Sequence, residues 1–231
     1  MKSDLLIAPS ILSADFGSLS EEAKRLENSG ADMIHIDIMD GHFVPNLTMG
    51  PKAVSAINRA VDSFLDVHLM MYNPYEYIER FVESGADRIT FHFEAIENIE
   101  ETIDYIHKCG CEAGIAFNPD TTYEFIPKFL GKCDLILLMT VHPGFGGQEF
   151  MSSVLEKVQF TKALKDKAKV KKKFSKLNKE EPIDIQVDGG INLETGRLSA
   201  EAGANILVSG SHLFRQDDMR LAINELRHCK K

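Results

Sequence analysis

The chain has 231 residues, of which 44% are hydrophobic and 26% are charged. These proportions are ordinary for a globular protein, and they exclude a disordered chain, a collagen-like fibre and a coiled-coil rod. Lys and Arg number 26 against 35 Asp and Glu, so the formal net charge is −9. An acidic chain argues against nucleic-acid binding, which requires a basic surface.

The sequence also argues against a membrane partner and a secreted fold. No apolar run reaches the ~18 residues that a membrane span requires, and the first residues lack the apolar core of a signal peptide. The four cysteines show neither C-x-x-C spacing nor the density of a disulfide framework. We therefore expect reduced thiols in a cytoplasmic protein.

One pattern recurs along the chain: a short β-branched or apolar run, a polar loop, and then an amphipathic stretch. The predicted strands are 5–8, 33–38, 64–70, 88–93, 112–117, 135–141, 183–187 and 205–209. The predicted helices are 18–29, 51–62, 74–84, 97–109, 121–130, 150–175, 194–202 and 217–229. Alternating strands and helices are typical of a parallel sheet, and eight units predict one (β/α)8 barrel domain over residues 1–231.

Glycines mark three of the predicted helix ends. Ser-Gly-Ala-Asp occurs at 29–32 and at 84–87, and the related Ala-Gly-Ala-Asn occurs at 202–205. A glycine in this place commonly adopts the left-handed conformation that ends a helix before the next strand. We expect Gly30, Gly85 and Gly203 to do so.

A lysine-rich segment separates the sixth and seventh predicted strands. Residues 162–181 contain nine lysines and three acidic residues, a local charge of +6. This stretch is longer than one helix needs, so we predict an insertion at about 166–181. The favoured interpretation is a solvated, mobile extension of the preceding helix, and the alternative is a docking patch for an anionic partner.

Three strand ends carry the residue types of a metal site. His35, Asp37 and Met39 share one face of a strand because strand side chains alternate. His68 lies on a second strand, and Asp188 ends a third. Histidine and aspartate pointing into a barrel are costly unless they are paired or bound to a metal. Imidazole and carboxylate ligands suit zinc, manganese or ferrous iron, so we predict a metal site at the C-terminal mouth.

Glycine-rich loops follow the last three strands. They are Pro-Gly-Phe-Gly-Gly-Gln at 143–148, Asp-Gly-Gly at 188–190 and Ser-Gly-Ser at 209–211. Glycine lets backbone N–H groups approach phosphate oxygens, and barrels commonly bind phosphate after strands seven and eight. The 144–147 loop is long enough to act as a lid.

Two further residue types are candidates for the site. Met39, Met70 and Met139 fall near strand ends, where they either fill the core or form a water-excluding wall around a reacting anion. The remaining histidines show no partner pattern. His42 and His142 are candidates for substrate contact, and we interpret histidines 92, 107, 212 and 228 as structural or exposed.

Several long motifs resemble the ribulose-phosphate 3-epimerase family. They are APSILSADF at 8–16, HIDIMDGHFVPN at 35–46, HLM at 68–70, VHPGFGGQ at 141–148 and VDGGI at 187–191. The resemblance runs from about residue 5 to residue 229. It implies a (β/α)8 enzyme with one divalent metal ion per subunit (zinc, iron, manganese or cobalt), often a homodimer or homohexamer.

The resemblance also implies an activity and roles for individual residues. The activity is interconversion of D-ribulose 5-phosphate and D-xylulose 5-phosphate in the pentose phosphate pathway, by two-base proton transfer at C3 through an enediolate. By motif position His35, Asp37, His68 and Asp188 match the metal ligands, and Asp37 and Asp188 match the acid/base pair. The matching substrate and phosphate contacts are Ser10, His68, Gly144, Phe145, Gly146, Gly147, Asp188, Gly189, Gly190, Gly210 and Ser211. We expect Met39, Met70 and Met139 to shield the intermediate.

Three alternatives stay open. An allulose-6-phosphate 3-epimerase would use the same site chemistry on a longer substrate. A decarboxylase or aldolase on the same barrel would carry an Asp-x-Lys-x-x-Asp array, whose lysine is missing from residues 35–40. A non-catalytic sugar-phosphate-binding protein would normally have lost one of the four predicted ligands.

Overall fold

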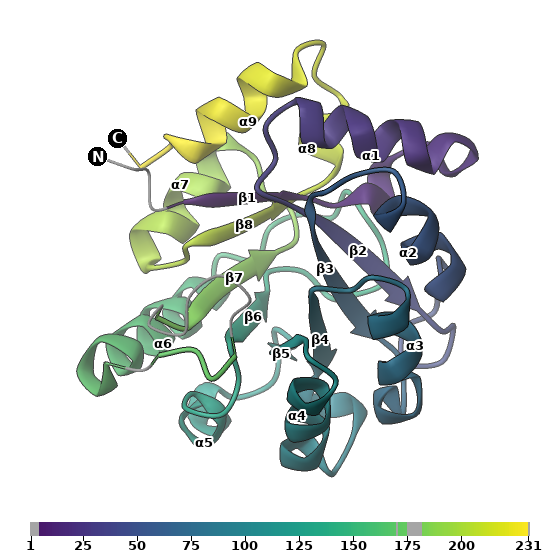
Figure 1. Ribbon diagram of the computed structural model, residues 1–231. Coiled ribbons are helices and arrows are strands. Elements are labelled where there is room, and N and C mark those ends of the chain that lie inside the picture. The colour runs from purple at the N-terminus through teal and green to yellow at the C-terminus, as the bar shows by residue number, and fades with distance from the viewer. Residues whose placement is uncertain (1–4, 170, 175–181, 231) are drawn as a thin grey trace.

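The computed structural model describes residues 5–169, 171–174 and 182–230, and its centre is a sheet of eight parallel strands (Figure 1). The strands are β1 (Leu6–Pro9), β2 (Met33–Met39), β3 (Phe64–Met70), β4 (Arg88–His92), β5 (Glu112–Phe117), β6 (Leu135–Met139), β7 (Asp184–Asp188) and β8 (Ile206–Ser209). The sheet order is β1-β8-β7-β6-β5-β4-β3-β2, and a parallel bridge between Ser10 and His35 joins its two edges. The predicted (β/α)8 barrel is confirmed.

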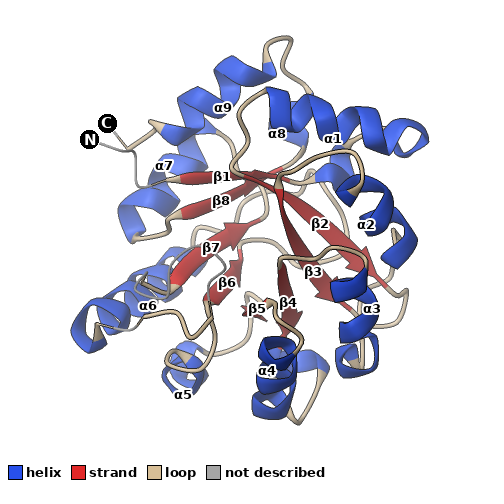
Figure 2. Ribbon diagram, in the orientation of Figure 1, coloured by secondary structure: helices blue, strands red, loops and turns tan. Residues whose placement is uncertain are grey.

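Helices surround the strands on the outside of the barrel (Figure 2). They are α1 (Leu19–Asn28), α2 (Pro51–Asn58), α3 (Ile78–Glu83), α4 (Ile99–Lys108), α5 (Ile126–Phe129), α6 (Val154–Ala168), α7 (Leu193–Ala202), α8 (Ser211–Phe214) and α9 (Met219–Arg227). The short α8 is not predicted by the sequence pattern. The prediction that the sixth helix reaches residue 175 is wrong, because α6 ends at Ala168 and Lys169 adopts a left-handed conformation with φ +49°.

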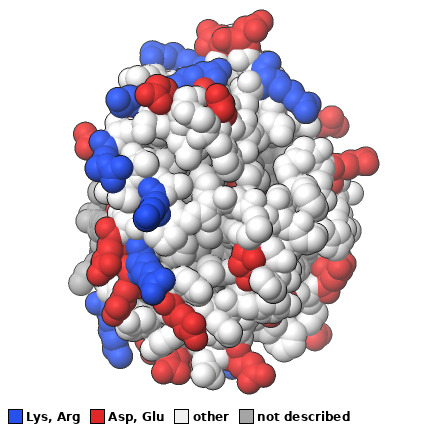
Figure 3. Space-filling model, turned by 90° about the vertical axis from the view of Figure 1, so that its right-hand side faces the viewer, with Lys and Arg blue, Asp and Glu red and all other residues white. Residues whose placement is uncertain are grey.

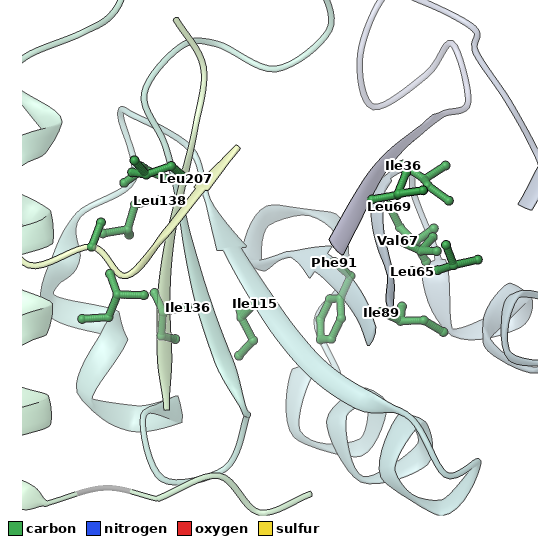
Figure 4. Packing of buried hydrophobic residues seen from close by; sticks show 14 of the residues in the cluster. Ile36, Leu65, Val67, Leu69, Ile89, Phe91, Ile115, Ile136, Leu138 and Leu207 are labelled. Carbon is green, nitrogen blue, oxygen red and sulfur yellow. The ribbon is translucent and has the colours of Figure 1, made fainter. Parts of the chain in front are cut away.

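The main hydrophobic core lies between the strands and these helices. Its strand side chains alternate with those that face the barrel axis, as Ile36 of β2 and Val67 of β3 illustrate (Figure 4). Both are fully buried, as are Phe81 of α3 and Ile223 of α9 on the helical side. This outer core leaves the axial face of each strand free to carry polar groups.

The helix ends behave as the glycine pattern predicts. Gly30, Gly85 and Gly203 have φ values of +85°, +102° and +121°, which L side chains adopt only under strain. At Gly203 an added Cβ would also lie 2.6 Å from the Lys162 side chain. These three positions therefore return the chain from a helix to the next strand.

A buried ion cluster lies at the N-terminal end of the barrel. Arg88, the first residue of β4, contacts Glu112 at 2.7 Å and Asp184 at 3.3 Å. Lys172 of the lysine-rich segment lies 2.9 Å from Asp184 and 3.4 Å from Glu112, and its side chain is only 6% exposed. The expectation of a solvated segment is therefore wrong for Lys172, because two buried carboxylates need its charge. Residues 170 and 175–181 of the predicted insertion lie outside the described residues.

The surface carries charges of both signs. On the side of the molecule seen in Figure 3, charged side chains lie mainly around the edge and uncharged side chains fill most of the centre. Within the described ranges, no helix is long and apolar enough to cross a membrane.

Candidate active site

Alternation along the strands turns the predicted ligands toward the barrel axis. His35, Asp37 and Met39 share one face of β2, and the parallel register places Asp37 beside His68 of β3. Asp188 is the last residue of β7. Because the strands are parallel, their C-terminal ends meet at one end of the barrel, and the three strands deliver their polar groups to one place.

Four side-chain atoms converge there. His35 Nε2, Asp37 Oδ1, His68 Nδ1 and Asp188 Oδ2 all lie within 4.8 Å of one another. Asp37 Oδ1 is 3.3 Å from His35 Nε2 and 3.2 Å from His68 Nδ1. Asp188 Oδ2 is 3.8 Å and 3.9 Å from the same two nitrogens. The two histidines and two aspartates predicted from the sequence are thus brought together.

The bonding within this cluster fits a divalent metal ion. His35 Nε2 is fully buried, and its 3.3 Å contact with Asp37 Oδ1 lacks hydrogen-bond geometry, so it has no hydrogen bond among the described residues. A buried polar atom without a partner costs ~1–3 kcal/mol, so it requires an explanation. Two imidazole nitrogens and two carboxylate oxygens form a ligand set that zinc, iron, manganese and cobalt accept. These four residues are placed to hold such an ion.

Further side chains orient the ligands. The Asp66 carboxylate lies 2.8 Å from His35 Nδ1 and also accepts a hydrogen bond of 2.7 Å from the Gln186 amide. Ser10 donates a hydrogen bond of 2.6 Å to Asp37 Oδ2. Ligand orientation by outer carboxylates is common at metal sites. Sequence reasoning assigned no role to Asp66 or Gln186, although their alternation with His68 and Asp188 places them on the axial faces.

The two aspartates differ in their protonation. Burial opposes ionisation of Asp37, but the adjacent His35 and His68 hold its pKa well below the usual range. Burial, reinforced by the charge of Asp37, raises the pKa of Asp188 to about 7. Burial lowers the pKa of His68 to about 4, whereas the carboxylates of Asp37 and Asp66 outweigh burial at His35 and raise its pKa. One carboxyl group is therefore ionised, and the other retains a proton near neutral pH.

A cavity of about 410 Å³ opens above the cluster. Its lining includes Asp37, Asp188 and these predicted residues: Ser10, Met39, Met70, Met139, Gly144, Phe145, Gly146, Gly147, Gly189, Gly190, Gly210 and Ser211. The three methionines are at most 4% exposed, so they form a water-poor wall on one side. His35 and His68 are fully buried and do not belong to the lining of this cavity.

The glycine-rich loops meet at the other side of this cavity. An added Cβ at Gly146 or Gly147 would lie 3.8 Å or 3.7 Å from Ser211 Oγ, so the loops after β6 and β8 are adjacent. At Gly190 φ is +64°, and a Cβ would lie only 2.8 Å from the backbone nitrogen of Phe150. Glycine at 190 is therefore required by the backbone path itself.

The histidines for which the sequence shows no partner pattern lie in different environments. His92, the last residue of β4, is fully buried, and its Nε2 lies 2.9 Å from Nε2 of His68. His212 lines the cavity, whereas His42 and His142 are not in its lining within the described chain. The alternation of side chains along β4 from Arg88 to His92 is the sequence signal that could have placed His92 on the axial face.

Comparison with known proteins identifies the family of this chain. The model of the "Ribulose-phosphate 3 epimerase family" matches residues 6–214. The chain belongs to the ribulose-phosphate 3-epimerase family. Among similar curated members, the ribulose-phosphate 3-epimerase of Chlamydia trachomatis is 51% identical over 220 residues, which cover 95% of this chain and 91% of that protein. The Bacillus subtilis epimerase is 48% identical over 224 residues, covering 97% and 99%.

Solved structures share the barrel at lower identity. A 3-hexulose-6-phosphate synthase superposes with a TM-score of 0.63 at 16% identity, covering 99% of both chains. KGPDC from Streptococcus mutans gives a TM-score of 0.70 at 13% identity, covering 97% of this chain and 96% of that one. These likenesses show the fold, and the epimerase family assignment comes from the sequence relatives.

Proposed function

We propose that this chain interconverts D-ribulose 5-phosphate and D-xylulose 5-phosphate by moving the proton at C3. The observation that carries the proposal is the pair of aspartates, Asp37 and Asp188, which line one cavity from two different strands and meet two buried histidines there. Family membership supplies the substrate class, and the geometry supports Asp37 and Asp188 as the acid and the base.

Inversion at C3 requires one proton to leave from one face of the carbon and another to arrive at the opposite face. Asp37, which stays ionised, accepts the proton on its side. Asp188, whose pKa lies at about 7 in the metal-free protein, delivers a proton on the other side. In the reverse direction the two residues exchange roles, and each positioned acid or base contributes ~10²–10⁴ in rate.

His35, Asp37, His68 and Asp188 would hold one divalent metal ion per subunit, with zinc, iron, manganese and cobalt as candidates. When bound, the ion supplies Lewis acidity that stabilises negative charge developing on substrate oxygens. Asp66 and Ser10 keep their partners His35 and Asp37 in the required orientation.

The remaining lining residues bind and shield the substrate. Gly146, Gly147, Gly190, Gly210 and Ser211 bring backbone and hydroxyl groups of three loops together, and they would bind the phosphate. Their binding energy orients C3 between the aspartates.

The other lining residues cover the reacting end. Met39, Met70 and Met139 exclude water near the reacting carbon, while Ser10, Gly144, Phe145 and Gly189 complete the wall around the sugar. The cytoplasmic location and the homo-oligomeric state stay predictions from the sequence.

The test compares turnover of D-ribulose 5-phosphate by the wild type and by the Asp37→Asn and Asp188→Asn variants. Each variant should remain folded and lose more than ~10²-fold in kcat. Near-normal turnover in either variant would contradict the two-base assignment. Faster turnover of D-allulose 6-phosphate by the wild type would instead identify a hexulose-phosphate epimerase.

A further inference from the structure

The ring of His68 is held from behind by a second histidine and a glutamate. We propose that His92 and Glu94 are positioning residues that fix the tautomer in which His68 presents the lone pair of Nδ1 to the metal ion. This inference rests on the metal site of the proposed function, and it assigns a role to two residues that sequence reasoning left without one.

The three side chains form a continuous hydrogen-bonded line. His68 Nε2 lies 2.9 Å from His92 Nε2, and the two ring planes meet at 25° with centroids 5.0 Å apart. His92 Nδ1 lies 3.3 Å from Glu94 Oε2. Both histidines are fully buried, so protein groups and not water determine which ring nitrogens carry hydrogen.

When a metal ion takes the lone pair of His68 Nδ1, the donor and acceptor properties of these contacts allow one arrangement. The Glu94 carboxylate can only accept, so His92 Nδ1 carries a hydrogen. With its hydrogen on Nδ1, His92 offers Nε2 as an acceptor, and His68 Nε2 donates to it. His68 Nδ1 then presents its lone pair to the ion between Asp37 and Asp188; without the ion, the same nitrogen lies within hydrogen-bond distance of Asp37 Oδ1, at 3.2 Å.

Glu94 is itself held in its charged, accepting form. Its Oε1 accepts hydrogen bonds from the backbone N–H of Asn118, at 2.9 Å, and from the Thr121 hydroxyl. Lys157 of α6 is bound to the carbonyl oxygens of Asn118 and Thr121, at 2.8 Å and 2.7 Å. The loop after β5 is thereby fixed, and Glu94 Oε2 stays directed at His92.

The metal-binding nitrogen of His35 is selected by a single direct contact. Its Nδ1 contacts the Asp66 carboxylate directly, which leaves Nε2 for the metal ion. The two ligands therefore use opposite ring nitrogens, and each is assigned by an acceptor behind it. For His68 that acceptor is Nε2 of His92, and the hydrogen bond between His92 Nδ1 and Glu94 keeps this nitrogen free to accept.

Glu94→Gln is the sharpest test because it is nearly isosteric. Asn118 N–H and the Thr121 hydroxyl both donate to Oε1, so the carbonyl of glutamine must take that position. Its NH₂ group then faces His92 Nδ1 and requires an acceptor there. The donor and the acceptor then exchange places in the hydrogen bonds of His92 to residue 94 and to His68. His68 Nδ1 carries the hydrogen in that arrangement and is unable to bind the ion. Glu94→Asp keeps a carboxylate and serves as the conservative variant.

The measurement is the affinity of purified, metal-free protein for Mn²⁺ and Co²⁺, determined by competition with a chelator, together with the visible absorption of bound Co²⁺. His92→Phe is the second variant because it removes the acceptor. His107→Phe is the matched control. It loses a comparable histidine–carboxylate contact, 2.7 Å to Asp134, at the other end of the barrel. Thermal unfolding of the metal-free forms reports folding.

Glu94→Gln and His92→Phe should bind both ions about 10–100-fold more weakly and alter the Co²⁺ spectrum. Glu94→Asp should bind within a few-fold of the wild type, and His107→Phe should be unchanged. Wild-type affinity in folded Glu94→Gln and His92→Phe, or equal weakening in His107→Phe, would overturn the inference and leave the metal site standing. Failure of the wild type to bind either ion would overturn the metal site and the inference together.

Discussion

Replacing Asp188 by asparagine should stabilise the metal-free protein at alkaline pH while it removes catalysis. The Asp188 carboxylate lies 3.8 Å and 3.9 Å from the nearest histidine nitrogens, which is too far for a hydrogen bond. Its side chain is only 17% exposed, and it adjoins the ionised Asp37. Asparagine carries no charge, so the Asp188→Asn change removes the burial cost of the carboxylate and its repulsion by Asp37, which together outweigh the attraction to His35 that is also lost.

The magnitude and the sign of the expected stability change follow from the pKa of Asp188. A rise from 3.8 to about 7 corresponds to ~4 kcal/mol as an upper bound, since each tenfold change in an acid constant is worth ~1.4 kcal/mol. Because the native carboxyl binds its proton more tightly than the unfolded one, its contribution to stability is complete below pH ~4 and is lost as the pH rises through about 7. With partial exposure to water, we expect a gain of ~2 kcal/mol in the variant at pH 8, or ~4–8 °C in Tm.

The assay is thermal and urea denaturation with a chelator present, at intervals from pH 5 to pH 8. The advantage of the variant should be largest at pH 8 and shrink toward pH 5. Asp37→Asn is the control, and it should lower the stability of the metal-free protein. Asp37 accepts a 2.6 Å hydrogen bond from Ser10 and pairs with both histidines, and the variant weakens these interactions. An Asp188→Asn protein that is less stable at pH 8, or an advantage independent of pH, would refute the reasoning.

Three other perturbations have defined outcomes. Removal of metal by a chelator should abolish epimerisation, and Zn²⁺, Mn²⁺, Fe²⁺ or Co²⁺ should restore it; full turnover in protein shown to be metal-free would contradict the site. Lys172→Met should lower the free energy of unfolding by ~2–4 kcal/mol, because Asp184 and Glu112 lose a buried counter-ion, and an unchanged urea midpoint would argue against this role. Gly190→Ala should raise KM at least ~10-fold, because its Cβ would lie 2.8 Å from the Phe150 nitrogen. A wild-type KM in Gly190→Ala would contradict the close approach of Gly190 to the backbone of Phe150.

Local sequence patterns were sufficient to predict the strands and the ligand set. Every predicted strand agrees with an observed one to within about two residues. The signals used, apolar β-branched runs for strands and glycines at helix ends, act through residues that are close together in the chain. His35, Asp37, His68 and Asp188 were predicted because strand alternation places them on axial faces. The roles of the individual site residues and the single-domain organisation stay predictions.

The contacts that the sequence did not predict join side chains from different elements of the barrel. His92 meets His68 because β3 and β4 are neighbouring strands, and no local motif singles out His92. Lys172 belongs to a run of lysines that looks solvated, yet the start of β7 supplies Asp184 as its buried partner. Such contacts depend on the closed barrel and not on any short stretch of the chain.

Proton exchange at C3 tests the central claim most directly. Metal-replete protein would be incubated with D-ribulose 5-phosphate in D₂O, and the C3 proton would be followed by NMR with and without prior chelation. The account predicts loss of the C3 proton signal as deuterated D-xylulose 5-phosphate appears, and no exchange after chelation. A C3 proton retained by metal-replete protein would contradict removal and return of a proton at C3 by Asp37 and Asp188.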